Sequence, residues 1–87
     1  MEGKMRRSRI DIIIDILDVA KEGVNKTGIV YRTNLNFTLA QKYLELLRKN
    51  NLMENKSDKY ITTEKGKNFL EKAREITLYL EDASQIQ

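Results

Sequence analysis

The chain has 87 residues, enough for one domain with a modest core, and its 40% apolar and 33% charged residues are typical of a soluble globular protein. The absence of cysteine and histidine excludes a zinc site, a thiolate nucleophile, a Ser–His pair and a disulfide framework. No apolar run approaches the roughly 20 residues of a membrane span and no secretory signal is evident, so we expect a cytoplasmic protein without a cofactor, metal or small-molecule ligand.

The net charge of +3 is unevenly distributed along the sequence. Residues 1–25 contain five basic and five acidic side chains, whereas residues 26–67 contain nine basic and four acidic ones. Residues 68–87 contain two basic and four acidic side chains. A local surplus of Lys and Arg is suited to neutralising phosphate groups, and a solvated surface of ordinary sign imbalance fits the charge pattern equally well.

The N-terminal part of the chain predicts a basic, poorly ordered arm over residues 1–7, followed by a helix. Ser8 can cap this helix, with Asp11 in its positively polarised first turn. The spacing of apolar residues predicts a main buried face and a second apolar edge, which would contact a partner subunit or the C-terminal helix. The main face consists of Ile10, Ile13, Ile14, Leu17 and Ala20, and the second edge of Ile12, Ile16 and Val19. An acidic stripe on the same helix (Asp11, Asp15, Asp18 and Glu22) can bind a cation or a basic partner, but such a stripe is more commonly a solvated face.

Gly23 is expected to end the first helix as a left-handed cap. Thr27 can then cap a short second helix over residues 28–33, and residues 34–36 form a tight turn in which Leu35 points inward. A turn of this length between two short helices is typical of the helix-turn-helix connection.

A third helix is predicted to begin at Asn36 and to bury Ala40, Leu44 and Leu47. Thr38 is an alternative start, because Gln41 would complete a capping box with it. We prefer Asn36, since it leaves a polar face of residue types that reach base edges and phosphates in a major groove, although the same types are ordinary surface residues. That face consists of Phe37, Thr38, Gln41, Lys42 and Glu45.

A β-hairpin is predicted next, with strands over residues 52–55 and 59–62 joined by residues 56–58. Asn51 is expected to adopt the left-handed conformation between helix and strand. Lys56 and Lys59 lie near the tip of the hairpin. Their two interpretations are contact with a sugar-phosphate backbone, as in a wing, and protection of a strand edge against aggregation.

A long last helix is predicted from its cap, Thr63, to near the C-terminus. Its apolar residues recur at alternating spacings of four and three, which indicates a heptad seam. The seam consists of Phe69, Ala73, Ile76, Leu80 and Ala83. About two turns can pack on so small a core, so the remainder is expected to pair with a second copy. The alternative is a single amphipathic helix folded back on the monomer.

A family resemblance is carried by the segments TGIVYRTNLNFTLAQKYLELLRKNNLMEN and YITTEKGKNFLEKAREI. They closely resemble the small archaeal winged-helix family of predicted transcriptional regulators, which includes the 10a-type DNA-binding proteins of archaeal chromatin. The resemblance covers about residues 8–80, and its most specific parts are residues 29–31 with 34–35, residues 42–44 with Leu47, and Tyr60 with Thr62 and residues 64–66.

The resemblance implies an α+β fold: a winged helix-turn-helix, with a three-helix core and a β-hairpin wing, whose long C-terminal helix forms an antiparallel coiled-coil dimer. We expect a single domain over residues 1–87, divided into the basic arm (1–7), the helix-turn-helix and wing (8–62) and the dimerisation helix (63–85). The implied function is that of a homodimeric, nucleoid-associated protein that binds double-stranded DNA, either as a transcriptional regulator or as a chromatin-type architectural protein.

Carried onto this sequence, the resemblance places DNA-facing positions on the third helix, the wing and the basic arm, and we add one basic residue just before the predicted second helix and one within it. The full set is Arg6, Arg7, Arg9, Lys26, Arg32, Thr38, Gln41, Lys42, Lys56 and Lys59. The sequence departs from the family pattern at Asn51, where glycine is common, and in a C-terminal helix that stops soon after Ala83.

Two other classes of function are weighed against DNA binding. Winged helices also serve as protein–protein interaction modules, and the two apolar faces and acidic stripe of the first helix favour that alternative. An enzyme would have to rely on carboxylates, lysines or tyrosines alone, and no pair of these is marked out by an apolar pocket.

Overall fold

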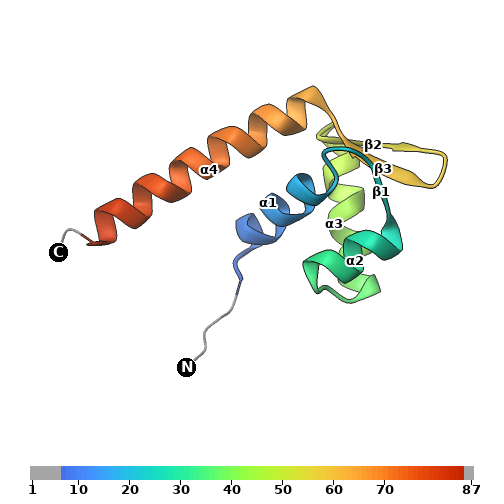
Figure 1. Ribbon diagram of the computed structural model, residues 1–87, viewed down its shortest axis with the longest axis horizontal. Coiled ribbons are helices and arrows are strands. Elements are labelled where there is room, and N and C mark those ends of the chain that lie inside the picture. The colour runs from blue at the N-terminus through green and yellow to red at the C-terminus, as the bar shows by residue number, and fades with distance from the viewer. Residues whose placement is uncertain (1–6, 86–87) are drawn as a thin grey trace.

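The computed structural model describes the backbone of residues 7–85 and the side chains of residues 7–80. The elements in chain order are α1 (Arg9–Val19), β1 (Val24–Asn25), α2 (Lys26–Thr33), α3 (Phe37–Lys49), β2 (Met53–Lys56), β3 (Lys59–Thr62) and α4 (Glu64–Gln85). The first three helices and a small sheet form a body, and α4 runs past α1 and extends beyond it (Figure 1). This arrangement confirms the predicted winged helix-turn-helix topology.

The start of α1 is fixed by reciprocal capping between two side chains. The Ser8 hydroxyl accepts a hydrogen bond from the Asp11 N–H at 3.2 Å, and the Asp11 carboxylate accepts one from the Ser8 N–H at 3.1 Å. Two of the N–H groups that a helix start leaves without intrahelical partners are thereby satisfied. The predicted cap is confirmed.

The predicted main face of α1 was partly wrong. Ile10, assigned to that face, is 40% exposed, whereas Ile12 and Ile16, assigned to the second edge, are buried. Leu17 and Ala20 are buried as predicted. The reason is that α1 packs against both α2 and α4, so its buried side is turned toward the second edge. The expected contact between α1 and the C-terminal helix is confirmed.

The segment between α1 and α2 contains a strand that the sequence analysis missed. Helix α1 ends at Val19 with Ala20 as its C-cap, earlier than predicted, and Gly23, at φ +95°, lies in the following turn and does not cap the helix. Strand β1 then pairs with β3, with Val24 opposite Tyr60. The sheet therefore has three antiparallel strands in the order β1-β3-β2.

Helix α2 begins two residues earlier than predicted, at Lys26, and its cap is Asn25 instead of Thr27. The Asn25 side chain accepts a hydrogen bond from the Gly28 N–H at 2.8 Å. The helix ends at Thr33, and its C-cap Asn34 has φ 60°, a conformation that asparagine tolerates better than most residues. Leu35 in the following turn is buried, as predicted.

Helix α3 begins where the sequence predicts. The Asn36 side chain accepts a hydrogen bond from the Leu39 N–H at 2.7 Å, so the start at Asn36 is confirmed over the start at Thr38. Ala40, Leu44 and Leu47 are fully buried, and Asn51 has the predicted positive φ, 63°. The helix thus turns one apolar side to the core and the opposite side outward.

The hairpin of β2 and β3 is displaced by one residue from the prediction in its first strand. Met53 pairs with Thr62 and Lys56 with Lys59, so Ser57 and Asp58 alone form the turn. The inner end of β3 is attached to α1: the Thr62 hydroxyl donates to the Leu17 carbonyl at 2.7 Å, and the Thr62 N–H donates to the Ala20 carbonyl at 3.0 Å.

Thr63 joins the end of α3 to the start of α4. Its hydroxyl accepts a hydrogen bond from the Gly66 N–H at 2.9 Å, which confirms its role as the cap of α4. The same hydroxyl donates to the Asn51 carbonyl at 2.7 Å, and the Thr63 N–H donates to the Leu52 carbonyl at 3.1 Å. The start of α4 is therefore joined by hydrogen bonds to the segment that follows α3.

Gly66 occupies a position at this junction that has no room for a side chain. A Cβ atom there would overlap the Leu52 carbonyl oxygen and come within 2.7 Å of the Thr62 methyl group. Replacement of glycine by alanine inside a helix normally stabilises it by about 1 kcal/mol. We expect Gly66→Ala instead to lower the free energy of unfolding by about 2 kcal/mol, measured by urea denaturation, because the backbone must shift. The exposed neighbour Lys65→Ala is the control, and a stabilised Gly66→Ala protein would contradict the packing.

The core is a single cluster to which α1, α2, α3, β2 and α4 all contribute. Its largest fully buried side chains are Ile16, Leu17, Ile29, Leu44, Leu47 and Met53. Within the described residues, no helix combines the length and the apolar character needed to cross a bilayer.

Candidate nucleic-acid interface

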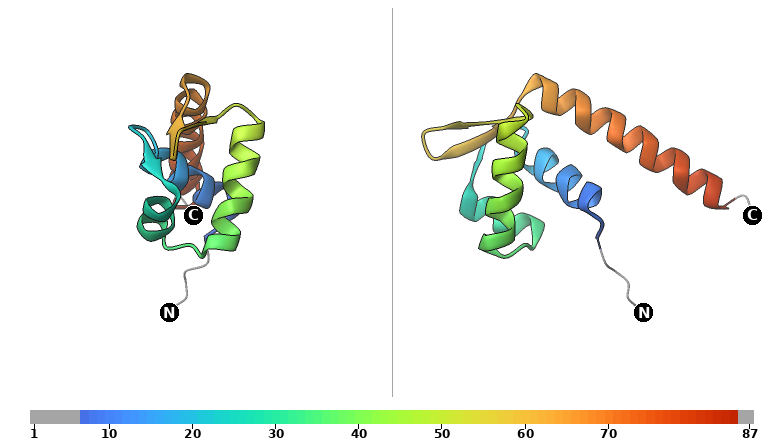
Figure 2. Two further views of the ribbon diagram at one scale, coloured as in Figure 1. Left: turned by 90° about the vertical axis from the view of Figure 1, so that its right-hand side faces the viewer. Right: turned by 180° about the vertical axis from the view of Figure 1, so that it is seen from behind.

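The polar side of α3 lies on the surface of the body. Thr38, Lys42, Glu45 and Arg48 are exposed, and Gln41 is partly exposed. In the view from behind, α3 lies at the front, with the hairpin extending to one side and α4 to the other (Figure 2). The predicted outward face of α3 is therefore confirmed and is continuous with the hairpin.

A groove separates α3 from the hairpin and has a volume of about 820 Å³. Gln41, Glu45 and Arg48 line it from α3, and Asn55 and Lys56 line it from β2. Such a groove, with an exposed helix on one side and a β-hairpin on the other, can accommodate a protruding ridge on the surface of a partner. Its side chains include both hydrogen-bond donors and acceptors.

The two wing lysines face each other across the hairpin. Lys56 and Lys59 are direct cross-strand partners, and the Lys56 side chain is 70% exposed. The Lys56 ammonium is 3.7 Å from a Glu54 carboxylate oxygen, an exposed pair that contributes little to stability. Because like charges directly opposite each other destabilise a hairpin, a bound anion would relieve this repulsion.

Gln41 is held between two charged side chains. Its amide oxygen accepts a hydrogen bond from the Lys26 ammonium, and its amide nitrogen donates to a Glu45 carboxylate oxygen at 3.0 Å. Lys26 therefore lies beside α3, and its charge is partly committed to contacts within the protein.

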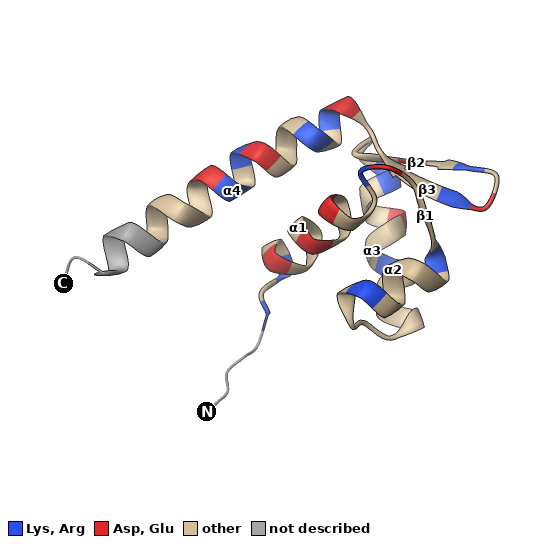
Figure 3. Ribbon diagram, in the orientation of Figure 1, with Lys and Arg blue, Asp and Glu red and all other residues tan. Residues whose placement is uncertain are grey.

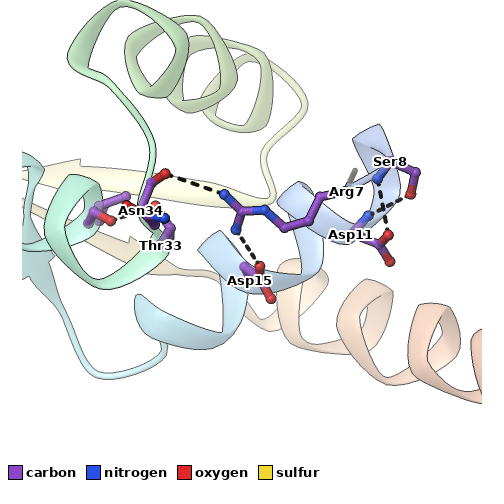
Figure 4. A network of polar contacts seen from close by, with 7 residues as sticks. Arg7, Ser8, Asp11, Asp15, Thr33 and Asn34 are labelled. Atoms are coloured by element: carbon purple, nitrogen blue, oxygen red, sulfur yellow. Dashed lines mark hydrogen bonds and ion pairs between the residues drawn. The ribbon is translucent and has the colours of Figure 1, made fainter. Parts of the chain in front are cut away.

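The basic residues before α1 and at its start differ in position. Arg6 lies outside the described residues. Arg7 is bound to the body: its guanidinium contacts Asp15 at 2.9 Å and donates to the Asn34 carbonyl at 3.5 Å (Figure 4). Arg9 lies beside Lys42 in a hollow of about 450 Å³ over α3, and it extends the basic surface of that helix.

The charged side chains are segregated between elements (Figure 3). Lys and Arg outnumber Asp and Glu on α2, where Arg32 is exposed, and on α3, whereas the hairpin carries two residues of each sign and α1 carries a row of acids. Asp15 is paired with Arg7, and Asp18 with Lys21 and Arg74, so the acidic stripe of α1 is largely engaged within the chain. The basic surplus that was predicted from the sequence therefore lies mainly on α2 and α3.

Sequence reasoning did not select Arg48 and Asn55, which line the groove. The signal for Arg48 was available, because Gln41, Glu45 and Arg48 are spaced so that they share one face of a helix. Asn55 carries no comparable signal, since its position depends on the fold of the hairpin against α3.

The distal half of α4 carries an apolar stripe without a partner among the described residues. Ile76 and Leu80 form this stripe, one helical turn apart, and each is 60% exposed. Leu78 and Tyr79 are also exposed, on other sides of the helix. Of the other predicted seam residues, Ala73 is buried in the protein's own core and Phe69 is partly buried against it, and the side chain of Ala83 lies outside the described residues. The uncovered part of the seam thus begins at Ile76.

Comparison with known proteins identifies the class. A family model described as winged helix-turn-helix matches residues 6–81, so the chain belongs to the winged helix-turn-helix family. An uncharacterized protein of Methanocaldococcus jannaschii is 35% identical over 65 residues, which cover 74% of this chain and 67% of the relative. The crystal structure of Sso10a-2, a DNA-binding protein from Sulfolobus solfataricus, is similar with a TM-score of 0.71 and 30% identity over 91% of this chain and 90% of that one. The resemblance to archaeal winged-helix proteins is confirmed.

Proposed function

We propose that this protein binds double-stranded DNA, with α3 entering the major groove and the wing lysines contacting the sugar-phosphate backbone. The observation that carries the proposal is the uncovered polar face of α3 beside a hairpin that presents the cross-strand pair Lys56 and Lys59. The similarity to Sso10a-2, a DNA-binding protein, supports the same function. A protein–protein interaction module needs neither the exposed polar face of α3 nor the lysine pair of the hairpin.

Contacts to phosphate are expected to supply most of the affinity. The candidates are Lys42 and Arg48 on α3, Lys56 and Lys59 on the wing, and Arg9 beside α3. Each neutralised phosphate releases condensed counterions, so the affinity of such a complex falls steeply as the salt concentration rises.

In this proposal the protein acts as a homodimer, in which the α4 helices of the two chains pack against each other. The exposed apolar residues at 76 and 78–80 are the supporting observation, because soluble monomers rarely expose so many large apolar side chains in one place. Pairing of two α4 helices in antiparallel orientation would cover this stripe and direct the two winged bodies away from each other.

The role of the dimer, as a regulator or an architectural protein, depends on how strongly it selects sequence. Few side chains on the first half of α3 read bases, and none is an arginine, so the common bidentate contact to guanine is missing there. We therefore favour limited sequence preference. Selection of binding sites from a random duplex pool separates the roles: a long enriched motif indicates a regulator, and tight, salt-sensitive binding with weak enrichment indicates an architectural protein.

Replacement of both wing lysines tests the proposal. We expect the double variant Lys56→Ala, Lys59→Ala to bind all duplexes about tenfold more weakly, and the slope of log affinity against log salt to become shallower by about two. Fluorescence anisotropy at several salt concentrations measures both quantities.

A matched control removes the same charge elsewhere. Lys21 and Lys67 line a separate hollow between the turn after α1 and α4, so Lys21→Ala, Lys67→Ala should leave the salt slope nearly unchanged. An equal effect of both double variants would reject the wing as a DNA contact, and a lack of salt-sensitive binding by the unaltered protein would favour the interaction module.

A further inference from the structure

The orientation of the Gln41 amide is determined by its two charged neighbours. Lys26 can only donate a hydrogen bond and ionised Glu45 can only accept one. Rotation of the amide by half a turn would place its NH2 group against the ammonium and its oxygen against the carboxylate. The observed arrangement, with the oxygen toward Lys26 and the nitrogen toward Glu45, is therefore the one that these neighbours select.

These contacts use half of the hydrogen-bonding capacity of the amide. A glutamine amide offers two N–H donors and two acceptor lone pairs. With one donor given to Glu45 and one lone pair to Lys26, one N–H and one lone pair remain. Where the two contacts take the lone pair and the N–H on the Cγ side of the amide, the donor and the acceptor that remain lie side by side and form a free edge of the planar group.

This free edge lies on the part of α3 that is expected to enter the DNA. Gln41 is in the first half of the helix, is partly exposed and lines the groove toward the wing. In the major groove, adenine presents the complementary pattern, with N7 as acceptor and the N6 amino group as donor. Guanine presents two acceptors and would leave the amide oxygen of Gln41 without a donor.

We propose that Gln41 reads an adenine in the major groove, and that Glu45 and Lys26 are positioning residues that fix its amide in the adenine-reading orientation. The inference rests on the proposed DNA-binding function and adds a base identity to it. The proposal also gives a role to Glu45. A carboxylate on a DNA-facing surface repels phosphate, and here its contribution is to orient the neighbouring Gln41 amide.

Selection from a random duplex pool with the full-length protein and with Gln41→Ala tests the reading residue. The unaltered protein should enrich adenine at one position of its site, and Gln41→Ala should lose that enrichment while still binding the pool. In the best-bound duplex, 7-deazaadenine at that position, which lacks the N7 acceptor, should weaken binding by the unaltered protein about tenfold and leave Gln41→Ala unaffected.

Glu45→Gln tests the positioning role, because a glutamine at this place can donate as well as accept and no longer selects one orientation of the amide. In this variant the ratio of affinities for adenine and guanine at the same position should decrease. Its affinity for unselected DNA should increase, because a negative charge has been removed. In the background of Gln41→Ala, Glu45→Gln should no longer change the ranking of bases. A merely structural role for Glu45 would change affinity for all sequences alike and leave the ranking intact.

The outcomes separate this inference from the function on which it rests. The inference would be overturned, with DNA binding left in place, if the unaltered protein and Gln41→Ala ranked the bases identically. The same holds if 7-deazaadenine lowered the affinity of both proteins equally. No binding to any duplex by the unaltered protein would overturn both. Far-UV circular dichroism of each variant shows that loss of ranking does not come from loss of the fold.

Discussion

Replacement of Ile76 and Leu80 by glutamate is expected to reduce the mass of the protein in solution from about twice the 10.2 kDa of one chain to that of a single chain. Both side chains are 60% exposed in the monomer, so the monomer fold should tolerate the change. In a paired α4 seam, however, each carboxylate would be buried at a cost of several kcal/mol. The dissociation constant of the dimer should rise more than about a thousandfold, as measured by sedimentation equilibrium.

The control for this variant keeps the stripe apolar. Ile76→Leu, Leu80→Ile exchanges the two side chains, preserves their combined volume and should leave the protein dimeric. A dimer that persists in the glutamate variant would show that α4 is not the interface, and a monomeric unaltered protein would reject the proposed dimer itself.

Leu44→Ala is expected to have the largest effect on stability within one winged body. Leu44 is fully buried at the centre of α3, between the helices and β2, and its truncation leaves a cavity that the surrounding core fills only in part. We expect the free energy of unfolding to fall by about 3 kcal/mol, which corresponds to a decrease in Tm of about 10 °C or more. Chemical and thermal denaturation at one fixed protein concentration measure the loss.

Leu46→Ala provides the matched comparison on the same helix. The chemical change and the helix propensities are identical, but Leu46 is 45% exposed, so the cost should stay below about 1 kcal/mol. Equal losses at the two positions would mean that α3 is rotated about its axis relative to the arrangement described, and its polar face would then not point outward.

Local signals in the sequence predicted most of the helices and their caps correctly. Ser8, Asn36 and Thr63 each precede a helix and supply a side-chain oxygen to the first free N–H groups, which depends only on neighbours three residues away. The apolar spacing in α3 identified its buried side for the same reason. Capping and helical periodicity are local, so a single sequence contains them.

The buried face of α1 was harder to predict because isoleucine occurs all around the start of the helix. Ile10, Ile12, Ile13 and Ile14 give almost no contrast between faces. Packing against α2 and α4 selects which of these residues is buried, and neither neighbour is close in sequence. Uniform hydrophobicity leaves the choice of face to tertiary contacts.

Strand β1 and the start of α2 were missed for a related reason. A strand of two residues, Val24 and Asn25, is too short to show an alternating pattern, and its pairing partners in β3 are far along the chain. Asn25 and Thr27 are both acceptable caps, and the pairing of Asn25 in the sheet favours the earlier start of α2.

For the candidate interface, the sequence predicted which elements carry it but not how its side chains are connected. The polar face of α3 and the wing lysines were recognisable from periodicity and turn residues. The contact of Lys26 with Gln41 joins two helices, and the contacts of Arg7 join α1 to the turn before α3, so neither follows from local spacing. These contacts determine which charges remain available to a ligand.

The Thr63 junction has a mechanical consequence for the proposed dimer. Because one hydroxyl group ties the Asn51 carbonyl to the first turn of α4, there is no flexible linker between the helix that would lie in the duplex and the rod that would carry the partner. Two duplexes held by one dimer would therefore be kept at a set distance and a set crossing angle, as by a rigid spacer, instead of swivelling freely about a hinge.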